Sequence, residues 1–130
     1  MAPTLGDILE SSHPELVATG FEFTEGPLYH PDGFLYVSDV DARVHYRVDL
    51  RSGEKTVIRT DSGGANGATF DADGRVVLCE QDARRVVRLE EDGGLTVVAD
   101  RYEGKRIDRA NDVVAGRDGT IYFTDPQGLI

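Results

Sequence analysis

The chain has little cysteine, a shortage of positive charge and no long apolar run. Cys79 is its single cysteine, so no disulfide can form within the chain, and its neighbours in RVVLCEQ predict a small core residue. Lys and Arg number 14 against 24 Asp and Glu, which gives a formal net charge of −10 at pH 7. The basic residues are scattered, and nucleic acids and anionic membranes attract positive surfaces. We therefore expect neither as a partner.

Targeting signals are also missing from the sequence. No stretch approaches the roughly 18 consecutive apolar residues of a membrane-spanning helix. The first twenty residues, MAPTLGDILESSHPELVATG, lack the basic start and apolar run of a secretory signal. Because the chain does not need an oxidising compartment either, we expect a cytoplasmic protein.

Several catalytic motifs are absent. The sequence contains no nucleophile elbow of a Ser-His-Asp hydrolase, no P-loop and no HExxH pair. The string DADG at 71–74 resembles the start of an EF-hand loop, but residues 75–77 supply neither the third oxygen ligand nor the central glycine. His13, His30 and His45 are too far apart to suggest a metal pair, and we expect His30 in a turn and His45 in a strand.

The chain does contain an internal repeat. Three Asp-Gly pairs, at 32–33, 73–74 and 118–119, are 41 and 45 residues apart. The segments around them read EGPLYHPDGFLYVSD, NGATFDADGRVVLCE and NDVVAGRDGTIYFTD. In each segment an oxygen-bearing residue stands seven positions before the Asp, and an acid stands seven positions after it. An Asp-Gly turn between two apolar runs predicts a hairpin in every repeat.

The first two hairpins continue into two further strand-like runs. These runs are RVHYRVDL and KTVIRT in the first repeat, and RRVVRLEE and LTVVAD in the second. Four-stranded units that repeat every ~40 to 45 residues are typical of β-propeller blades. A β-sandwich could also be built from such strands, but it gives no reason for polar residues to recur in register.

We therefore predict an all-β fold of propeller blades. An N-terminal arm is expected over residues 1–20 and a partial propeller over 21–130. Blade 1 is expected over about 21–60, blade 2 over about 61–103, and the start of blade 3 over about 104–130. The arm segment TLGDILESS is compatible both with a short helix and with an arm that closes a blade.

Glu25, Asn66 and Asn111 occupy the same position in the three repeats. The first strand of a propeller blade lines the central channel, so we expect these side chains to converge on the axis. Carboxylate and amide oxygens are the ligands that hard cations such as Ca²⁺ prefer. The alternative is that the three residues only begin strands, with the residues after them forming turns.

A second set of acids in register, Asp39, Glu80 and Asp125, ends the second strand of each repeat. Acids at such positions commonly accept hydrogen bonds from nearby backbone amides, so we expect a structural role. Arg43 and Arg84 are also in register, which predicts a repeated ion pair with these acids.

With these residues in place, the chain is similar to the senescence marker protein-30/gluconolactonase family of six-bladed propellers. The similarity runs from Phe21 to Leu129. Its most specific parts are FTEGPLYHPDGFLYVSD, NGATFDADGRVVLCEQDARRVVRL and ADRYEGKRIDRANDVVAGRDGTIYFTDPQGL. The resemblance implies a six-bladed propeller, of which about two and a half blades are present here. It also implies a metal-dependent lactonase that hydrolyses a sugar lactone to its aldonic acid.

The resemblance implies roles for individual residues. Glu25 of TEGP matches a ligand of the catalytic divalent cation, usually Ca²⁺ and sometimes Zn²⁺ or Mn²⁺. Asn111 of RAND matches an asparagine that contacts this cation or positions water and substrate. Arg109 matches an arginine that orients the substrate, and Asn66 is a channel-facing neighbour of the substrate.

Other parts of the implied site are not assigned. The string DRAND departs at residues 108–110 from the NSPND of gluconolactonase-like members, so the preferred lactone is left open. Two further metal ligands, an asparagine and an aspartate, belong to later blades of the family, and that aspartate is also the expected general base. Both are expected beyond Ile130.

Two other functions are compatible with the sequence. One is a non-catalytic propeller fragment with at most weak cation binding, and the other is a calcium-dependent phosphotriesterase-like hydrolase that would share Glu25 and Asn111. Because closed propellers have about four to eight blades, we expect a truncated chain that is inactive by itself. We also expect its last strand, TIYFT, to favour self-association through an unpaired edge.

Overall fold

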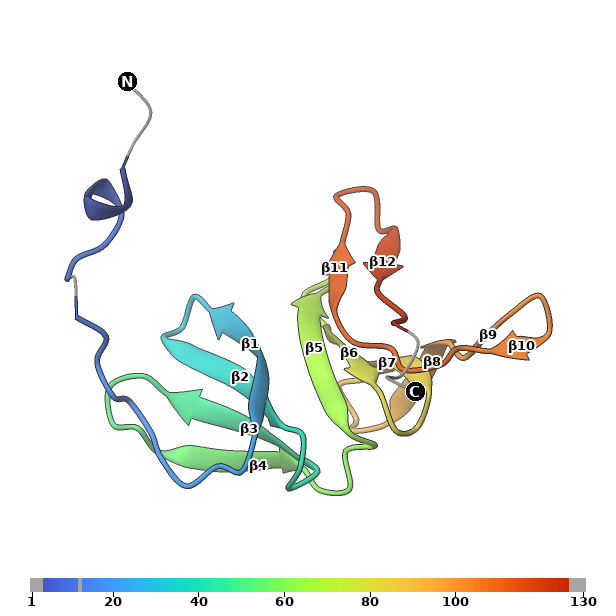
Figure 1. Ribbon diagram of the computed structural model, residues 1–130, viewed down its shortest axis with the longest axis horizontal. Helices are drawn as coiled ribbons and strands as arrows, with labels where there is room; N and C mark the ends of the chain where they lie inside the picture. Colours follow the sequence, from blue (N-terminus) through green and yellow to red (C-terminus); the bar gives the residue numbers. More distant parts are fainter. Residues whose placement is uncertain (1–3, 12, 127–130) are drawn as a thin grey trace.

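The computed structural model describes residues 4–11 and 13–126 as one short helix and twelve strands (Figure 1). The 3-10 helix η1 is Leu5–Asp7, and no helix among the described residues is long and apolar enough to cross a membrane. The strands are β1 (Thr24–His30), β2 (Phe34–Asp39), β3 (Val44–Asp49), β4 (Lys55–Arg59), β5 (Ala65–Phe70), β6 (Val76–Glu80), β7 (Arg85–Leu89), β8 (Leu95–Ala99), β9 (Arg101–Tyr102), β10 (Lys105–Arg106), β11 (Val113–Ala115) and β12 (Ile121–Phe123).

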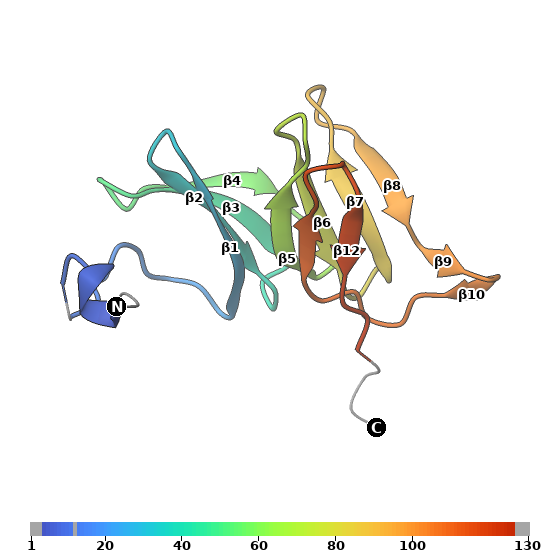
Figure 2. The same cartoon turned by 90° about the horizontal axis from the view of Figure 1, so that it is seen from above.

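Two four-stranded antiparallel sheets make up most of the structure. Their strand orders are β1-β2-β3-β4 and β5-β6-β7-β8, and β11 and β12 form a further hairpin. Each sheet is the consecutive meander that the repeat predicts. The hairpin β9-β10, in which Tyr102 pairs with Lys105, was not predicted. It projects away from the sheets (Figure 2), and its two-residue strands carry no alternation of apolar and polar residues that could announce it.

The three Asp-Gly turns have the same geometry. The backbone N–H of each turn glycine donates to the carbonyl three residues earlier at 3.0 Å, and His30 is both the last residue of β1 and the first residue of its turn. The φ angles of Gly33, Gly74 and Gly119 are 86°, 79° and 84°. Glycine adopts this left-handed region without the steric penalty of a β-carbon, which explains why the repeat carries it here.

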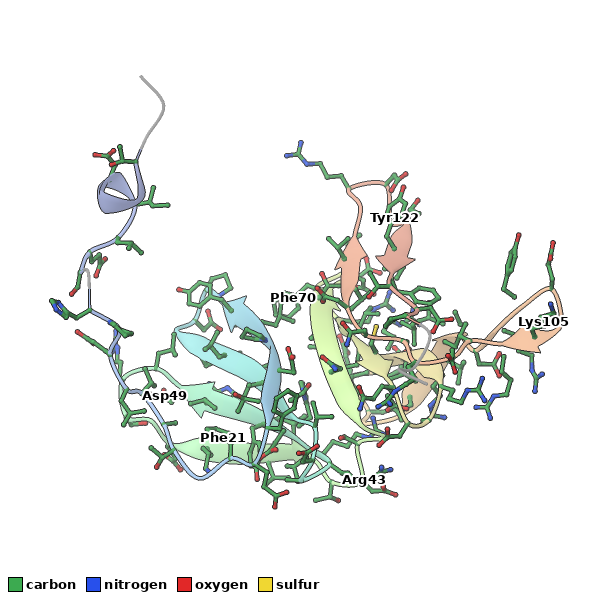
Figure 3. All side chains as sticks on the ribbon, in the orientation of Figure 1. Phe21, Arg43, Asp49, Phe70, Lys105 and Tyr122 are labelled. Atoms are coloured by element: carbon green, nitrogen blue, oxygen red, sulfur yellow. The ribbon has the colours of Figure 1, made fainter. Side chains whose placement is uncertain are left out.

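The first strand of each repeat lies beside the next one. Figure 1 shows β1, β5 and β11 side by side and running in the same direction, while the later strands of each sheet extend outward. Arg43 lies at the end of the molecule where these first strands begin, and Phe70 lies at the opposite end (Figure 3). The inner strands therefore begin at a common face.

Apolar side chains fill both spaces between neighbouring sheets, and β6 serves both. Its alternate residues Val76 and Leu78 pack toward the first sheet, with Val87 and with partly buried side chains such as Leu28 and Tyr36. Val77 and Cys79 pack with Val86 in the opposite direction, against Ile107, Ala110 and Val113. The predicted core position of Cys79 is thus confirmed, and the whole of β6 is buried because successive strand residues point to opposite faces.

The N-terminal segment ends packed on the first sheet. Phe21 meets the ring of Tyr46 edge-on, with the two centroids 5.5 Å apart. The Lys55 ammonium lies 4.3 Å from the Phe21 ring centroid and donates to the carbonyls of Thr19 and Gly20 at 2.8 and 2.7 Å. Of the two expectations for the arm, the helix is realised only as the single turn η1.

The predicted ion pairs of Arg43 and Arg84 with the strand-end acids are wrong. Arg43 pairs with Asp61 at 3.1 Å and with Asp82 at 2.8 Å. Arg84 donates to the backbone oxygen of Ile107 at 2.8 Å. Both arginines have a left-handed backbone, with φ of 58° and 59°, in the turn after the second strand of their repeat. From these turns their side chains reach the following repeat, so the two arginines connect neighbouring sheets.

Candidate metal and substrate site

Glu25, Asn66 and Asn111 line one cavity of about 200 Å³. Glu25 and Asn66 lie near the beginnings of β1 and β5, and Asn111 stands just before β11. The remaining lining comes from Gly26, Pro27, Gly67, Ala68 and Asp112. The structure thus brings together the three residues that the repeat places in register.

Two glycines allow the inner strands to approach so closely. A β-carbon on Gly26 would lie 2.0 Å from the backbone oxygen of Asn66, and one on Gly67 would lie 2.4 Å from Oδ1 of Asp112. The backbone N–H of Gly67 donates to the Asn111 carbonyl at 2.8 Å. The registers of β1 and β5 are irregular at these glycines, as in a β-bulge, which changes the direction of the side chains beside it. The glycines therefore act inside strands, and not in the turns of the alternative interpretation.

The three side chains differ in what holds them. The carboxylate of Glu25 and the carboxamide of Asn111 are partly exposed, and neither makes a hydrogen bond or ion pair to another residue of the described chain. Asn66 is only 6% exposed, and its Nδ2 donates to Oε1 of Gln81 at 3.2 Å. Two polar groups thus face the cavity without a partner among the described residues, while Gln81 holds the amide nitrogen of the third.

The donors around the cavity are oxygens. Within residues 4–11 and 13–126, no group of three or more His, Cys, Asp or Glu side chains is placed to hold a metal ion. The cavity instead offers one carboxylate and two carboxamides from the repeat positions. Hard cations such as Ca²⁺ bind carboxylate and amide oxygens, whereas Zn²⁺ favours nitrogen and sulfur. These residues therefore fit a hard divalent cation.

Arg109 lies outside the lining of this cavity. Its side chain is about half exposed, at 49%, and its Nη2 is 3.9 Å from Oδ1 of Asp82. The carboxylate of Asp82 also accepts a hydrogen bond from Nη1 of Arg43 at 2.8 Å. Asp82 consequently stands between one arginine of the first repeat and another at the start of the third.

Asp39 and Asp125 hold the backbone that leads into an inner strand. Asp125 accepts the N–H groups of Asp108 and Arg109, the latter at 2.7 Å, and Asp39 accepts those of the two residues at the same spacing, Glu22 and Phe23. Burial alone would raise the pKa of Asp39, but the hydrogen bonds from Phe23 and Glu22 outweigh it and lower that pKa. These contacts support a structural role for both acids.

Glu80 departs from this pattern. Its fully buried carboxylate pairs with Arg59 and Arg85 instead of with backbone amides. Asp39 and Asp125 each bind the backbone of two residues earlier in their repeat, and the equivalent residues before Glu80 are Gly63 and Gly64. A β-carbon on Gly63 would lie 2.9 Å from the Glu80 carboxylate. The longer acid is therefore accommodated by the missing side chain of Gly63.

A buried Ser–His pair lies behind Asn66. The Ser38 hydroxyl donates to the Asn66 backbone oxygen at 2.8 Å and lies 3.3 Å from Nδ1 of His45. Burial, and secondarily the charge of Arg59, lowers the pKa of His45 to about 4, so the imidazole is neutral near pH 7. Both side chains are fully buried, so they hold the backbone of Asn66 from behind and do not line the cavity themselves.

Sequence reasoning missed Gln81 and Ser38 as neighbours of the cavity. Gln81 follows Glu80 directly, but the equivalent residues in the other repeats are Val40 and Pro126. A search for polar residues that recur in register cannot detect it. Its partner Asn66 is fifteen residues away, so only the folded hairpin brings the two amides together.

These features define the class of the molecule as a β-propeller chain with an oxygen-lined cavity where its inner strands begin. Residues 23–128 match the family described as SMP-30/Gluconolactonase/LRE-like region, and the chain belongs to this family. The family that its motifs predict is therefore confirmed.

The chain is similar to two curated proteins, whose names differ from each other. It is 28% identical over 140 aligned positions to the gluconolactonase of Zymomonas mobilis, covering 96% of this chain and 39% of that protein. It is 27% identical over 124 positions to the diisopropyl-fluorophosphatase of Loligo vulgaris, covering 82% of this chain and 38% of that protein. The chain thus spans about two fifths of the length of these relatives.

Solved structures agree on the fold. A gluconolactonase from Xanthomonas campestris superposes with a TM-score of 0.79 at 32% identity, covering 85% of this chain and 37% of that one. Virginiamycin B lyase from Staphylococcus aureus gives a TM-score of 0.62 at 19% identity, over 78% of this chain and 34% of that one, and shares the fold alone. The propeller is also found in a WD40 domain, and the predicted fold class is confirmed.

Proposed function

We propose that this chain supplies part of the cation and substrate site of a metal-dependent lactonase, which hydrolyses a sugar lactone to its aldonic acid. The observation that carries the proposal is the cavity in which Glu25, Asn66 and Asn111 meet from three repeats. The gluconolactonases among its relatives support the choice of substrate class.

Each residue has a part in this proposal. Glu25 and Asn111 would hold the cation, because their side-chain oxygens line the same space and have no partner within residues 4–11 and 13–126. A bound divalent cation, Ca²⁺ in the first place and Zn²⁺ or Mn²⁺ otherwise, would polarise the lactone carbonyl. Asn66 would face the cation and the bound substrate from the same cavity, and Arg109 would orient the substrate from its rim. We propose none of these four residues as the general base.

The cation site is tested by calorimetric titration of the 130-residue chain with CaCl₂. We expect Glu25→Gln to weaken binding by at least about tenfold, because it removes the single carboxylate among the repeat positions. Glu22→Gln is the matched control, since it makes the same change of charge three residues away on an exposed side chain. Equal effects of the two substitutions would refute a cation at Glu25.

The substrate class is tested in an enzyme that contains this chain. Residues 1–126 are joined to the later blades of the Xanthomonas campestris gluconolactonase, with which the fold is shared. Acid release from glucono-lactone is followed in a pH-stat, with the parent enzyme as the positive control. We expect Ca²⁺-dependent hydrolysis that is lost in Glu25→Gln. A joined protein that folds, binds Ca²⁺ and leaves the lactone intact would refute the lactonase assignment.

A second candidate is a phosphotriesterase-like hydrolase on the same scaffold. The observation that favours it is the similarity to diisopropyl-fluorophosphatase over 82% of the chain. It would use Glu25 and Asn111 in the same way but cleave a bond to phosphorus. Assaying the joined enzyme with a fluorophosphate beside the lactone separates the two, because the preferred substrate shows the higher kcat/KM.

A further inference from the structure

Gln81 makes a side-chain hydrogen bond to Asn66, one of the residues that line the cavity. It begins the connection between β6 and β7, and its backbone N–H donates to the Gly64 carbonyl at 3.1 Å. The next residue, Asp82, donates in the same way to Gly63 at 3.0 Å. The base of the Gln81 side chain is therefore fixed relative to the start of β5, two residues before Asn66.

This contact distinguishes the two ends of the Asn66 carboxamide. Oε1 of Gln81 accepts from Nδ2 of Asn66 at 3.2 Å, so the amide nitrogen is directed at Gln81. The Asn66 backbone is held independently, because its carbonyl accepts from Ser38 Oγ at 2.8 Å. With the nitrogen directed away and the backbone held, Oδ1 is the group of Asn66 left for the cavity that it lines with Glu25 and Asn111.

We propose that Gln81 is a positioning residue, which makes Asn66 an oxygen donor to the cation in the cavity. The inference rests on the proposed cation site and deepens it. An asparagine that turned the other way would present its NH₂ group, which a cation repels and which suits a substrate oxygen instead. Partners that orient a metal ligand typically contribute about ten- to a hundredfold to metal affinity.

Two substitutions at Gln81 distinguish the loss of its hydrogen-bond acceptor from a change in the size of its side chain. Gln81→Glu keeps an acceptor for Asn66, whereas Gln81→Met keeps a similar length without a strong one. We expect Gln81→Met to weaken Ca²⁺ binding by about tenfold in calorimetric titrations of the 130-residue chain. We expect Gln81→Glu to bind Ca²⁺ at least as tightly as the parent chain, since it keeps the acceptor for Asn66 and adds a negative charge.

Asn66→Asp distinguishes a positioning role of Gln81 from a merely structural one, through its effect on the Ca²⁺ affinity of Gln81→Met. A carboxylate presents an oxygen in either orientation, so Gln81 has nothing left to orient. We therefore expect Gln81→Met to lose its effect on Ca²⁺ affinity in the Asn66→Asp background. Folding of every variant is checked by the dispersion of amide resonances in ¹⁵N–¹H spectra.

The outcomes separate this inference from the function on which it rests. If Glu25→Gln weakens Ca²⁺ binding and Gln81→Met does not, the cation site stands and the positioning role of Gln81 is refuted. An equal effect of Gln81→Met in both backgrounds also refutes it, because the effect then does not pass through the Asn66 amide. If neither Glu25→Gln nor Gln81→Met changes Ca²⁺ affinity, the cation site fails, and this inference fails with it.

Discussion

The backbone oxygen of Asn66 lies so close to Gly26 that a β-carbon on that glycine would be 2.0 Å from it. The contact joins the first strands of the first two repeats beside the cavity, and Gly26 has a φ of +55°. No side chain can be added here unless the backbone of β5 moves. The spacing of the inner strands, and with it the width of the cavity, therefore depends on this glycine.

Gly26→Ala is expected to destabilise the chain strongly. The left-handed φ costs about 1 kcal/mol for a residue with a β-carbon, and the overlap with a backbone atom adds at least about 2 kcal/mol. The measurement is the free energy of unfolding in urea. Gly33→Ala is the matched control, because Gly33 has a φ of +86° and open space around the added β-carbon. Similar losses for both variants would show that the close approach to Asn66 has no energetic consequence.

The stability of the chain is expected to fall as the pH drops from about 6.5 to about 4. The pKa of His45 is lowered to about 4 by burial and by Arg59, from an ordinary value of 6.5. The unfolded chain therefore takes up a proton over this range while the folded chain does not, and the stability contributed by neutral His45 is complete only above the unfolded pKa. The loss amounts to about 3 kcal/mol.

Urea unfolding of the parent chain and of His45→Gln at several pH values checks this expectation. Carboxylates such as Asp39, whose pKa is lowered in the folded chain, also begin to lose their contribution to stability as the pH falls to their ordinary value of 3.8. The difference between the two curves isolates the histidine, because both proteins share the carboxylates. Curves that stay parallel between pH 7 and pH 4 would contradict a neutral, buried His45.

Asp82→Asn is expected to raise the KM for lactone in the joined enzyme. The substitution removes the charge beside Arg109, whose Nη2 is 3.9 Å from the carboxylate. Half-exposed ion pairs contribute at most about 1 kcal/mol, so the increase should not exceed about fivefold. Asp61→Asn is the control, since Asp61 pairs with Arg43 but not with Arg109. An equal change in both variants would assign the effect to Arg43 and not to the substrate arginine.

Cys79 is expected to resist thiol reagents in the folded chain. Burial, together with the carboxylates of Asp112 and Asp125, raises its pKa to about 12, and the side chain is fully buried. Because the thiolate is the reactive form, labelling at about pH 8 should be at least a thousandfold slower than in the unfolded chain. Colorimetric titration with a disulfide reagent, with and without concentrated guanidinium, measures both rates. Rapid labelling under native conditions would contradict the assignment of Cys79 to the core.

Much of the fold could be predicted from local pattern. The Asp-Gly turns require a left-handed glycine, and the apolar runs on either side alternate as strands do, so the hairpins follow from residues that are near one another in sequence. The hairpin β9-β10 could not be predicted in this way. Its strands are two residues long and polar, and they carry neither signal.

The candidate site likewise contains residues that could be predicted from the sequence and residues that could not. Glu25, Asn66 and Asn111 could be selected because an oxygen-bearing residue recurs at one position of three repeats, and identical units place identical positions together. Gln81 could not be selected, since no repeat partner is polar. The partners of Arg43 could not be selected either, because a backbone φ of 58° carries its side chain toward the next sheet.

The sequence by itself thus determined the repeating unit, its turns and the register in which the cavity residues recur, since all of these rest on local backbone preference and periodicity. The tertiary structure decided how close the inner strands lie, which acid meets which arginine, and which way the Asn66 amide is turned. Those features depend on contacts between residues far apart in the chain, where packing of the neighbouring sheet selects among directions that the local sequence allows equally.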